Sequence, residues 1–181
     1  LPHDWQIYHV KDLYRSSVGF YKKTFTLQEE PDARYIALDF EGVYMNWAVW
    51  VNGKKAGECK YGYSALEIDI SKFVHSGKNE LLVIAVYQNC NTRWYSGAGI
   101  FRDVHLINSP ETHLLSDGVY FSAKPLDPQK LDGEWKLIIS SEVASGKTLR
   151  QAQGPQVQGA QIQGPHVSHT IIDLTGKQFA A

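Results

Sequence analysis

The first 110 residues alternate between apolar and polar positions in short runs, which is the period of β-strands. In residues 35–40, for example, Ile36, Leu38 and Phe40 occupy every second position, and we expect them to point together into a core. Residues 81–87 are continuously apolar instead, which predicts a strand buried on both faces. Strands are predicted over residues 19–27, 35–40, 47–51, 66–70, 81–87 and 100–107. No stretch before residue 110 has a sustained helical period, so the pattern predicts an all-β, antiparallel sandwich.

Turn residues divide these strands and mark a domain boundary. Asn52-Gly53 follows an apolar strand, and this dipeptide readily adopts positive φ at both positions of a hairpin turn. Pro110 ends the first series. Three further strands are predicted at 118–123, 134–140 and 169–174. Three strands are too few to close a sandwich, so we expect a domain over 1–112 and an incomplete second domain over 113–181.

A biased segment lies within the second domain. A Gln-x-Gln-Gly pattern recurs every five residues between 151 and 164. It contains too few apolar side chains to offset the entropy of ordering the chain. We therefore expect a flexible Gln/Gly-rich loop at about 150–168. A repeat that binds a ligand is the alternative, but no residue type in the segment supports it.

The overall charge excludes some partners. The chain has 18 basic and 19 acidic residues and a formal net charge of -1, which argues against electrostatic binding to nucleic acid or to an anionic membrane. No apolar run reaches the roughly 20 residues that span a bilayer, and no signal peptide is recognisable.

Cys59 and Cys90 fit no metal-ligand spacing. They are two buried thiols or one disulfide, and they do not fix the cellular compartment.

The acidic residues offer no convincing catalytic pair. Glycosidases need two carboxylates across the scissile bond, and most acidic residues here lie in turns or on polar strand faces. Glu41, directly after an apolar strand, is the strongest single candidate, although a carboxylate at a strand end often only binds backbone. The histidines are scattered. We therefore predict no catalytic residue and no metal site in this chain.

One loop carries the residue types that bind carbohydrate. Asn91, Arg93, Trp94 and Tyr95 lie close together in sequence. Aromatic faces stack on sugar rings, while amide and guanidinium groups hydrogen-bond to neighbouring hydroxyls. The alternative is that Trp94 and Tyr95 fold back and close the end of the sandwich, with Arg93 paired to a local carboxylate.

Several motifs resemble, in order, the first domain of family 2 glycoside hydrolases of the β-galactosidase type. They are Leu1-Pro2-His3-Asp4-Trp5, the strand 19–25, Phe40-Glu41-Gly42-Val43-Tyr44, Val49-Trp50-Val51-Asn52-Gly53, Gly57 with Gly62-Tyr63, residues 69–71 with 77–81, and the run from Arg93 to Val104. Each motif alone is weak. Their shared order across residues 1 to about 110 makes the resemblance specific.

The resemblance implies a jelly-roll sandwich at 1–112 and the start of an immunoglobulin-like domain at 113–181. The catalytic barrel, with both catalytic glutamates, would lie outside this chain, as would the ligands of any sodium or magnesium ion. Asn91, Arg93, Trp94 and Tyr95 would form a substrate rim, and Asp4 and Trp5 would contact the rest of the enzyme. The implied partners are a β-galactoside or related sugar and the barrel of the same enzyme, which could form a homo-oligomer in a bacterial cytoplasm or periplasm.

Two alternatives stay open. A stand-alone, lectin-like carbohydrate-binding module would share the sandwich and the aromatic loop. A structural or adhesive sandwich would have no sugar site at all. Fold alone does not separate these functions, but the ordered motifs favour the non-catalytic part of a β-galactosidase-like retaining glycosidase.

Overall fold

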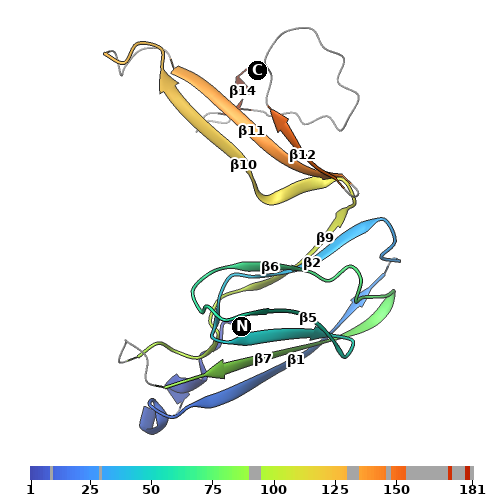
Figure 1. Cartoon of the computed structure of the whole chain (residues 1–181), viewed down its shortest axis with the longest axis vertical. Helices are drawn as coiled ribbons and strands as arrows, with labels where there is room; N and C mark the ends of the chain where they lie inside the picture. The colour runs from blue at the N-terminus through green and yellow to red at the C-terminus, as the bar shows by residue number, and fades with distance from the viewer. Residues whose placement is uncertain are drawn as a thin grey trace. The chain divides into compact units, whose positions relative to one another are not determined.

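The computed structural model describes residues 1–8, 10–28, 30–89, 95–129, 135–145, 148–153, 171–172 and 178–179 (Figure 1). The chain divides into two compact units, Leu1–Pro110 and Glu111–Ala181. Each unit is built from antiparallel strands, which confirms the predicted all-β class. In the described part, no helix is long and apolar enough to cross a membrane.

Two sheets face each other in the first unit. Their strand orders are β1-β7-β4-β5 and β6-β2-β9, and a short β3-β8 ladder lies beside them. The elements are the 3-10 turns η1 (Trp5–Tyr8) and η2 (Val10–Asp12), and the strands β1 (Ser17–Leu27), β2 (Arg34–Phe40), β3 (Val43–Tyr44), β4 (Trp47–Val51), β5 (Lys54–Cys59), β6 (Leu66–Asp69), β7 (Gly77–Tyr87), β8 (Gly99–Ile100) and β9 (Val104–Pro110).

Apolar side chains from both sheets form one core. The predicted inward positions Ile36, Leu38 and Phe40 of β2 are each at most 3% exposed. They pack in the same cluster as Val49 of β4 and Val83 of β7. The sandwich predicted from the alternation is therefore confirmed, with its core between β2 on one side and β4 and β7 on the other.

Two strand predictions need correction. Along β7, alternate side chains are buried, whereas Leu82, Ile84 and Val86 are only half-buried. The strand is thus covered fully on one face, not on both. The expected strand 100–107 is split, because Ile100 pairs with Val43 in β3 whereas Val104 pairs with Phe40 in β2. The chain changes partner strands between these two positions.

The second unit forms a three-stranded and a two-stranded sheet. The strands are β10 (His113–Pro125), β11 (Trp135–Ser145), β12 (Thr148–Gln153), β13 (Ile171–Ile172) and β14 (Gln178–Phe179). β12 pairs with β11, so residues 151–153 of the expected flexible loop are a strand; residues 154–168 lie outside the described residues. The immunoglobulin-like assignment of this unit stays a prediction.

One of the two cysteines, Cys59, lies within the described residues. Cys59, at the end of β5, is a free, half-buried thiol. Its Sγ lies 3.4 Å from the carbonyl oxygen of Tyr61. Cys90 lies outside the described residues. The structure therefore shows no disulfide at Cys59, and this thiol is less buried than expected.

The Asn52-Gly53 turn adopts the conformation expected from its sequence and is anchored by Asn79. The φ angles are 51° at Asn52 and 77° at Gly53. The Asn79 amide, 1% exposed, donates to the carbonyls of His75 and Gly77 and accepts from the His75 amide and from Asn52 Nδ2 at 2.8 Å. One buried side chain thus joins the β4–β5 turn to the loop before β7.

Replacement of Asn79 by alanine should therefore destabilise the chain by about 3 kcal/mol, because it leaves several buried polar groups without their partner. Urea unfolding monitored by tryptophan fluorescence measures this loss. Asn108→Ala is the matched control, since Asn108 accepts a hydrogen bond from Arg34 on the exposed surface. It should cost less than about 0.5 kcal/mol. Equal losses in the two variants would contradict the role given to Asn79.

Candidate functional site

The candidate site lies at one end of the first unit, where the start of the chain meets residues 95–100. The amide of His3 donates to the carbonyl of Ile100 at 2.7 Å, and the amide of Trp5 donates to that of Ala98 at 3.1 Å. The start of the chain thus runs along the segment that carries the glycines of the family motif. Residues distant in sequence are thereby brought to one surface.

The carboxylate of Asp4 is the centre of this junction. Oδ1 accepts from the amides of Gln6 at 3.0 Å and Ala98 at 2.9 Å, and Oδ2 accepts from the hydroxyl of Tyr95. Gly97 has a φ of 73°, and a Cβ at this position would lie 2.9 Å from Asp4 Oδ2. Glycine is therefore required both for the backbone conformation and for the close approach of the carboxylate.

Tyr95 is held neutral by this arrangement. Burial, the hydrogen bond to the Asp4 carboxylate and the negative charge of that group together raise the pKa of its hydroxyl to about 12. A neutral Tyr95 can donate its proton to Asp4, whereas a phenolate would be repelled by the carboxylate. The contact therefore holds Tyr95 against the start of the chain.

The aromatic side chains of Trp5 and Tyr21 pack together beside the Asp4 junction. Trp5 Nε1 donates to Ser17 Oγ at 2.9 Å, and the Trp5 ring lies where a Cβ on Gly19 would be. The Tyr21 hydroxyl accepts from the Ile100 amide at 3.3 Å, and burial raises the pKa of this hydroxyl. The predicted contact of Asp4 and Trp5 with the rest of an enzyme stays a prediction; the structure shows that both residues organise this end of the unit.

A polar pocket of about 320 Å³ opens beside the junction. Its lining combines an indole, an amide, a carboxylate, a guanidinium and two hydroxyls: Trp5, Gln6, Asp12, Arg15, Ser16 and Ser17. These groups both donate and accept hydrogen bonds beside an aromatic surface, which is the chemistry that binds a polyhydroxylated ring. A larger cavity of about 590 Å³ lies between β1 and β9, but its lining is mainly apolar, with the buried Phe40 and Val83 and the exposed Leu106 among its residues.

Gln6 gives the pocket an unusual polar group. The side chain is 4% exposed, and its Nε2 donates to the carbonyl of Leu13 at 2.9 Å. Its Oε1 is buried without a hydrogen-bond partner among the described residues. An unsatisfied buried acceptor costs about 1–3 kcal/mol, so a ligand hydroxyl or a water that donates to Oε1 would recover part of this cost.

Of the predicted rim residues, the structure describes Tyr95, which donates to Asp4 and does not line the pocket. The amide of Asn89 donates to Ser16 Oγ at 3.0 Å, and Asn89 Nδ2 donates to the carbonyl of Tyr14. The chain therefore reaches residue 89 beside the pocket and returns at Tyr95. The predicted rim residues Asn91, Arg93 and Trp94 lie outside the described residues, and their sugar-binding role stays a prediction.

Sequence reasoning missed Gln6, Asp12 and Arg15 as pocket residues. They lie in and after two short 3-10 turns, which have no long-range periodicity to recognise. A signal was nevertheless present, because Asp12, Arg15 and the adjacent Ser16-Ser17 place opposite charges and hydroxyls between two aromatic segments.

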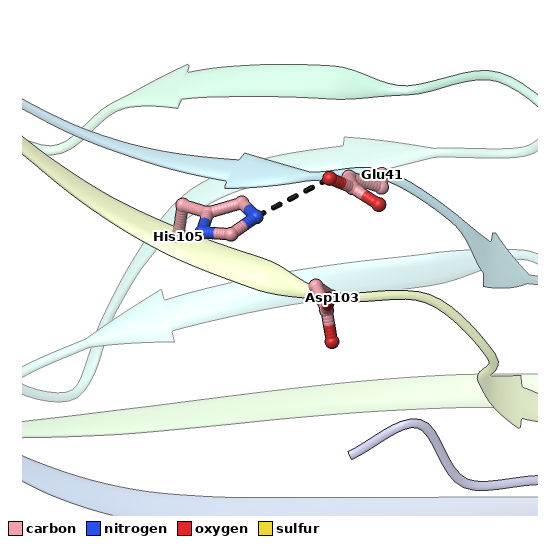
Figure 2. Close-up of side chains that lie close together, drawn as sticks. All are labelled: Glu41, Asp103 and His105. Carbon is pink, nitrogen blue, oxygen red and sulfur yellow. Dashed lines mark hydrogen bonds and ion pairs between the residues drawn. The ribbon is translucent and has the colours of Figure 1, made fainter.

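The candidate carboxylate Glu41 lies elsewhere. It is half-buried after β2, and its Oε1 lies 3.2 Å from Nε2 of His105 on β9, as Figure 2 shows. It does not line the polar pocket. The backbone bond at this strand end is made by the amide of Glu41, which donates to the carbonyl of Asp103 at 3.1 Å, rather than by the carboxylate that was expected to make it.

Comparison with known proteins links this geometry to carbohydrate enzymes. Residues 8–110 match the family described as "Glycosyl hydrolases family 2, sugar binding domain". The beta-galactosidase BoGH2A of Bacteroides ovatus is 30% identical over 87% of this chain and 21% of its own length. A beta-galactosidase of Clostridium acetobutylicum is 30% identical over 82% of this chain and 17% of its own length. The chain thus spans about a fifth of the length of these relatives.

Solved structures show the same fold. A beta-glycosidase from Bacteroides vulgatus matches with a TM-score of 0.69 and 29% identity, over 81% of this chain and 20% of that one. A beta-glucuronidase of Bacteroides uniformis matches with a TM-score of 0.64 and 28% identity, over 79% and 18% of the two chains. The expected resemblance is therefore confirmed, and the chain belongs to glycosyl hydrolase family 2, with residues 8–110 corresponding to the sugar-binding domain of that family.

Proposed function

We propose that this chain supplies the non-catalytic, sugar-facing part of a larger retaining glycosidase of the β-galactosidase type. In such an enzyme one carboxylate forms a glycosyl intermediate while a second acts as acid and then as base. Both would belong to a barrel outside this chain, as would the ligands of a sodium or magnesium ion. The contribution of this chain would be to position the sugar and exclude water.

The observation that carries the proposal is the polar pocket beside the Asp4 junction. Asp12 can accept and Arg15 can donate hydrogen bonds, so the two together fit adjacent hydroxyls of one sugar. The buried Oε1 of Gln6 adds an acceptor without a partner among the described residues. Trp5 adds an aromatic surface. A β-galactoside or a related glycoside is the ligand we assign, in line with the family.

The loss of Arg15 should weaken catalysis without unfolding the protein. In a full-length enzyme that carries this chain, Arg15→Ala should lower kcat/KM for an aryl β-galactoside about 10- to 100-fold, the range for a lost hydrogen bond to a charged group. Steady-state kinetics and a thermal melt measure both effects. Arg34→Ala is the control, because Arg34 donates to Asn108 on β9 and does not line the pocket. If Arg15→Ala and Arg34→Ala had the same small effect, the pocket would not bind substrate.

The isolated chain should bind sugar weakly at most, because the pocket would cover only one side of the ligand. Titration of the chain with galactose and with lactose, followed by NMR, should give no saturation in the millimolar range. Saturable binding at about 1 mM or tighter corresponds to roughly 4 kcal/mol from this surface alone. Such binding at the pocket would identify the chain as an independent, lectin-like module and would refute the accessory role.

The rim must also be rigid to position a sugar, and the hydrogen bond from Tyr95 to Asp4 restrains it. The folded pKa of Tyr95, about 12, is above the ordinary value of 10.0. Between these values the folded state keeps a proton that the unfolded state has lost. The stability from this contact is therefore complete below pH 10 and decreases as the pH rises toward 12.

Tyr95→Phe should accordingly remove part of the alkaline destabilisation. The free energy of unfolding of the wild-type chain, measured in urea from pH 8 to about 11.5, should fall more steeply above pH 10 than that of the variant. Lysine titration affects both proteins alike, so the difference isolates Tyr95. Parallel profiles would show that Tyr95 does not donate to Asp4 in solution.

A further inference from the structure

The outer face of the β6-β2-β9 sheet contains a second group of chemically active side chains. Asp103 directly precedes β9 and His105 is its second residue, and because the two are two positions apart in an extended segment, we expect them to project to the same face. Glu41 follows β2 and lies opposite Asp103, because its amide donates to the Asp103 carbonyl. The strand pairing thus brings together residues that are distant in sequence (Figure 2).

The three side chains have the spacing of metal ligands. One ligand atom from each of Glu41, Asp103 and His105 lies within 4.8 Å of the others. Nε2 of His105 and Oε1 of Glu41 are 3.2 Å apart. Neighbouring ligands of tetrahedral zinc are about 3.4 Å apart, given bonds of about 2.0–2.1 Å. Two ligands are therefore already at the required separation, and the exposed Asp103 side chain can close the remaining gap by rotation.

The electrostatic surroundings favour a cation here. The nearest arginine in sequence, Arg102, is directed over the ring of Phe101, with Cζ 5.5 Å from the ring centre. Among the ion pairs described, His105 is the partner of Glu41, and none involves Asp103. On the neighbouring strand positions, Asp39 pairs in register with His105 and Glu67 pairs with Asp39. These carboxylates give the face a negative potential that attracts cations.

We propose that Glu41, Asp103 and His105 bind a divalent transition metal of the zinc class. Imidazole nitrogen combined with two carboxylates suits Zn²⁺, whereas Mg²⁺ prefers oxygen ligands alone. Two carboxylates and a neutral imidazole balance the charge of the ion, and water would complete the coordination. This differs from the sequence-based expectation of no metal in the chain. The proposed metal site is also independent of the polar pocket, which these three residues do not line.

The metal would have a structural role. Glu41 directly follows β2, and residues 101–103 lead from the Tyr95–Ile100 segment into β9. Phe101 lies against Gly42, where an added Cβ would be 2.6 Å from its ring. A shared ion would link the end of β2 to the beginning of β9 at this point. Binding to the folded state only would then stabilise the sandwich.

The test is calorimetric titration of the 181-residue chain with ZnCl₂. The wild-type chain should bind one Zn²⁺, and at about 100 times the dissociation constant its melting temperature should rise by about 5 °C. His105→Gln and Asp103→Asn should each weaken binding at least tenfold, as loss of a ligand predicts. Their metal-free melting temperatures should equal that of the wild type, because both side chains are exposed. Millimolar MgCl₂ should not displace the zinc.

Two controls test three of the other six histidines. The double variant His166→Gln/His169→Gln and the single variant His75→Gln should bind Zn²⁺ as tightly as the wild type. The proposal is overturned if the wild type does not bind Zn²⁺, if His105→Gln and Asp103→Asn bind it with unchanged affinity, or if either control abolishes binding.

Discussion

The carboxylate of Asp4 joins the beginning of the chain to the segment that follows the predicted rim. It accepts hydrogen bonds from Gln6, Tyr95 and Ala98, and hydrogen bonds to an ionised acceptor are about twice as strong as neutral ones. Without this group, η1 and residues 95–98 would keep the backbone hydrogen bond from Trp5 to Ala98 and the packing of Trp5 against the cluster that contains Ala98, but would lose the side-chain hydrogen bonds between them. The position of Gln6, and with it one wall of the polar pocket, depends on this carboxylate.

The sandwich provides the rigid support for that junction. Trp5 lies over Gly19 of β1, and Tyr21 of the same strand accepts from the Ile100 amide. The interior of the sandwich is filled by packed side chains of β2, β4 and β7. A site of this kind, carried by loops but fixed by strands, suits the proposed accessory role, in which it would position a ligand without itself supplying reactive groups.

The sequence allowed the strands, the core and the family to be predicted, because alternation and turn residues are local signals. Asn52-Gly53 is such a case, with both φ angles positive as expected. The pocket was not predicted, because Gln6, Asp12 and Arg15 lie in short turns whose approach to Asn89 depends on tertiary contacts. The same holds for Glu41 and His105, which become neighbours only through the β2–β9 register. The chain pairs with β3 at β8 and with β2 at β9, and no local sequence pattern indicates this change of partner strand.

Asp4 holds η1 and residues 95–98 together locally without determining how the core of the sandwich packs. Amide hydrogen exchange of the wild-type chain and of Asp4→Ala tests this local role most directly. The amides of Gln6 and Ala98 donate to Asp4 and should exchange at least about tenfold faster in the variant, as expected from the loss of roughly 1.4 kcal/mol of local protection. The core amides of Leu38 and Val83 should keep their chemical shifts, because their packing in the sandwich does not involve Asp4, although their exchange by global unfolding can rise by the same factor. Unchanged exchange at Gln6 and Ala98, or altered chemical shifts at Leu38 and Val83, would show that Asp4 does not act in this local way.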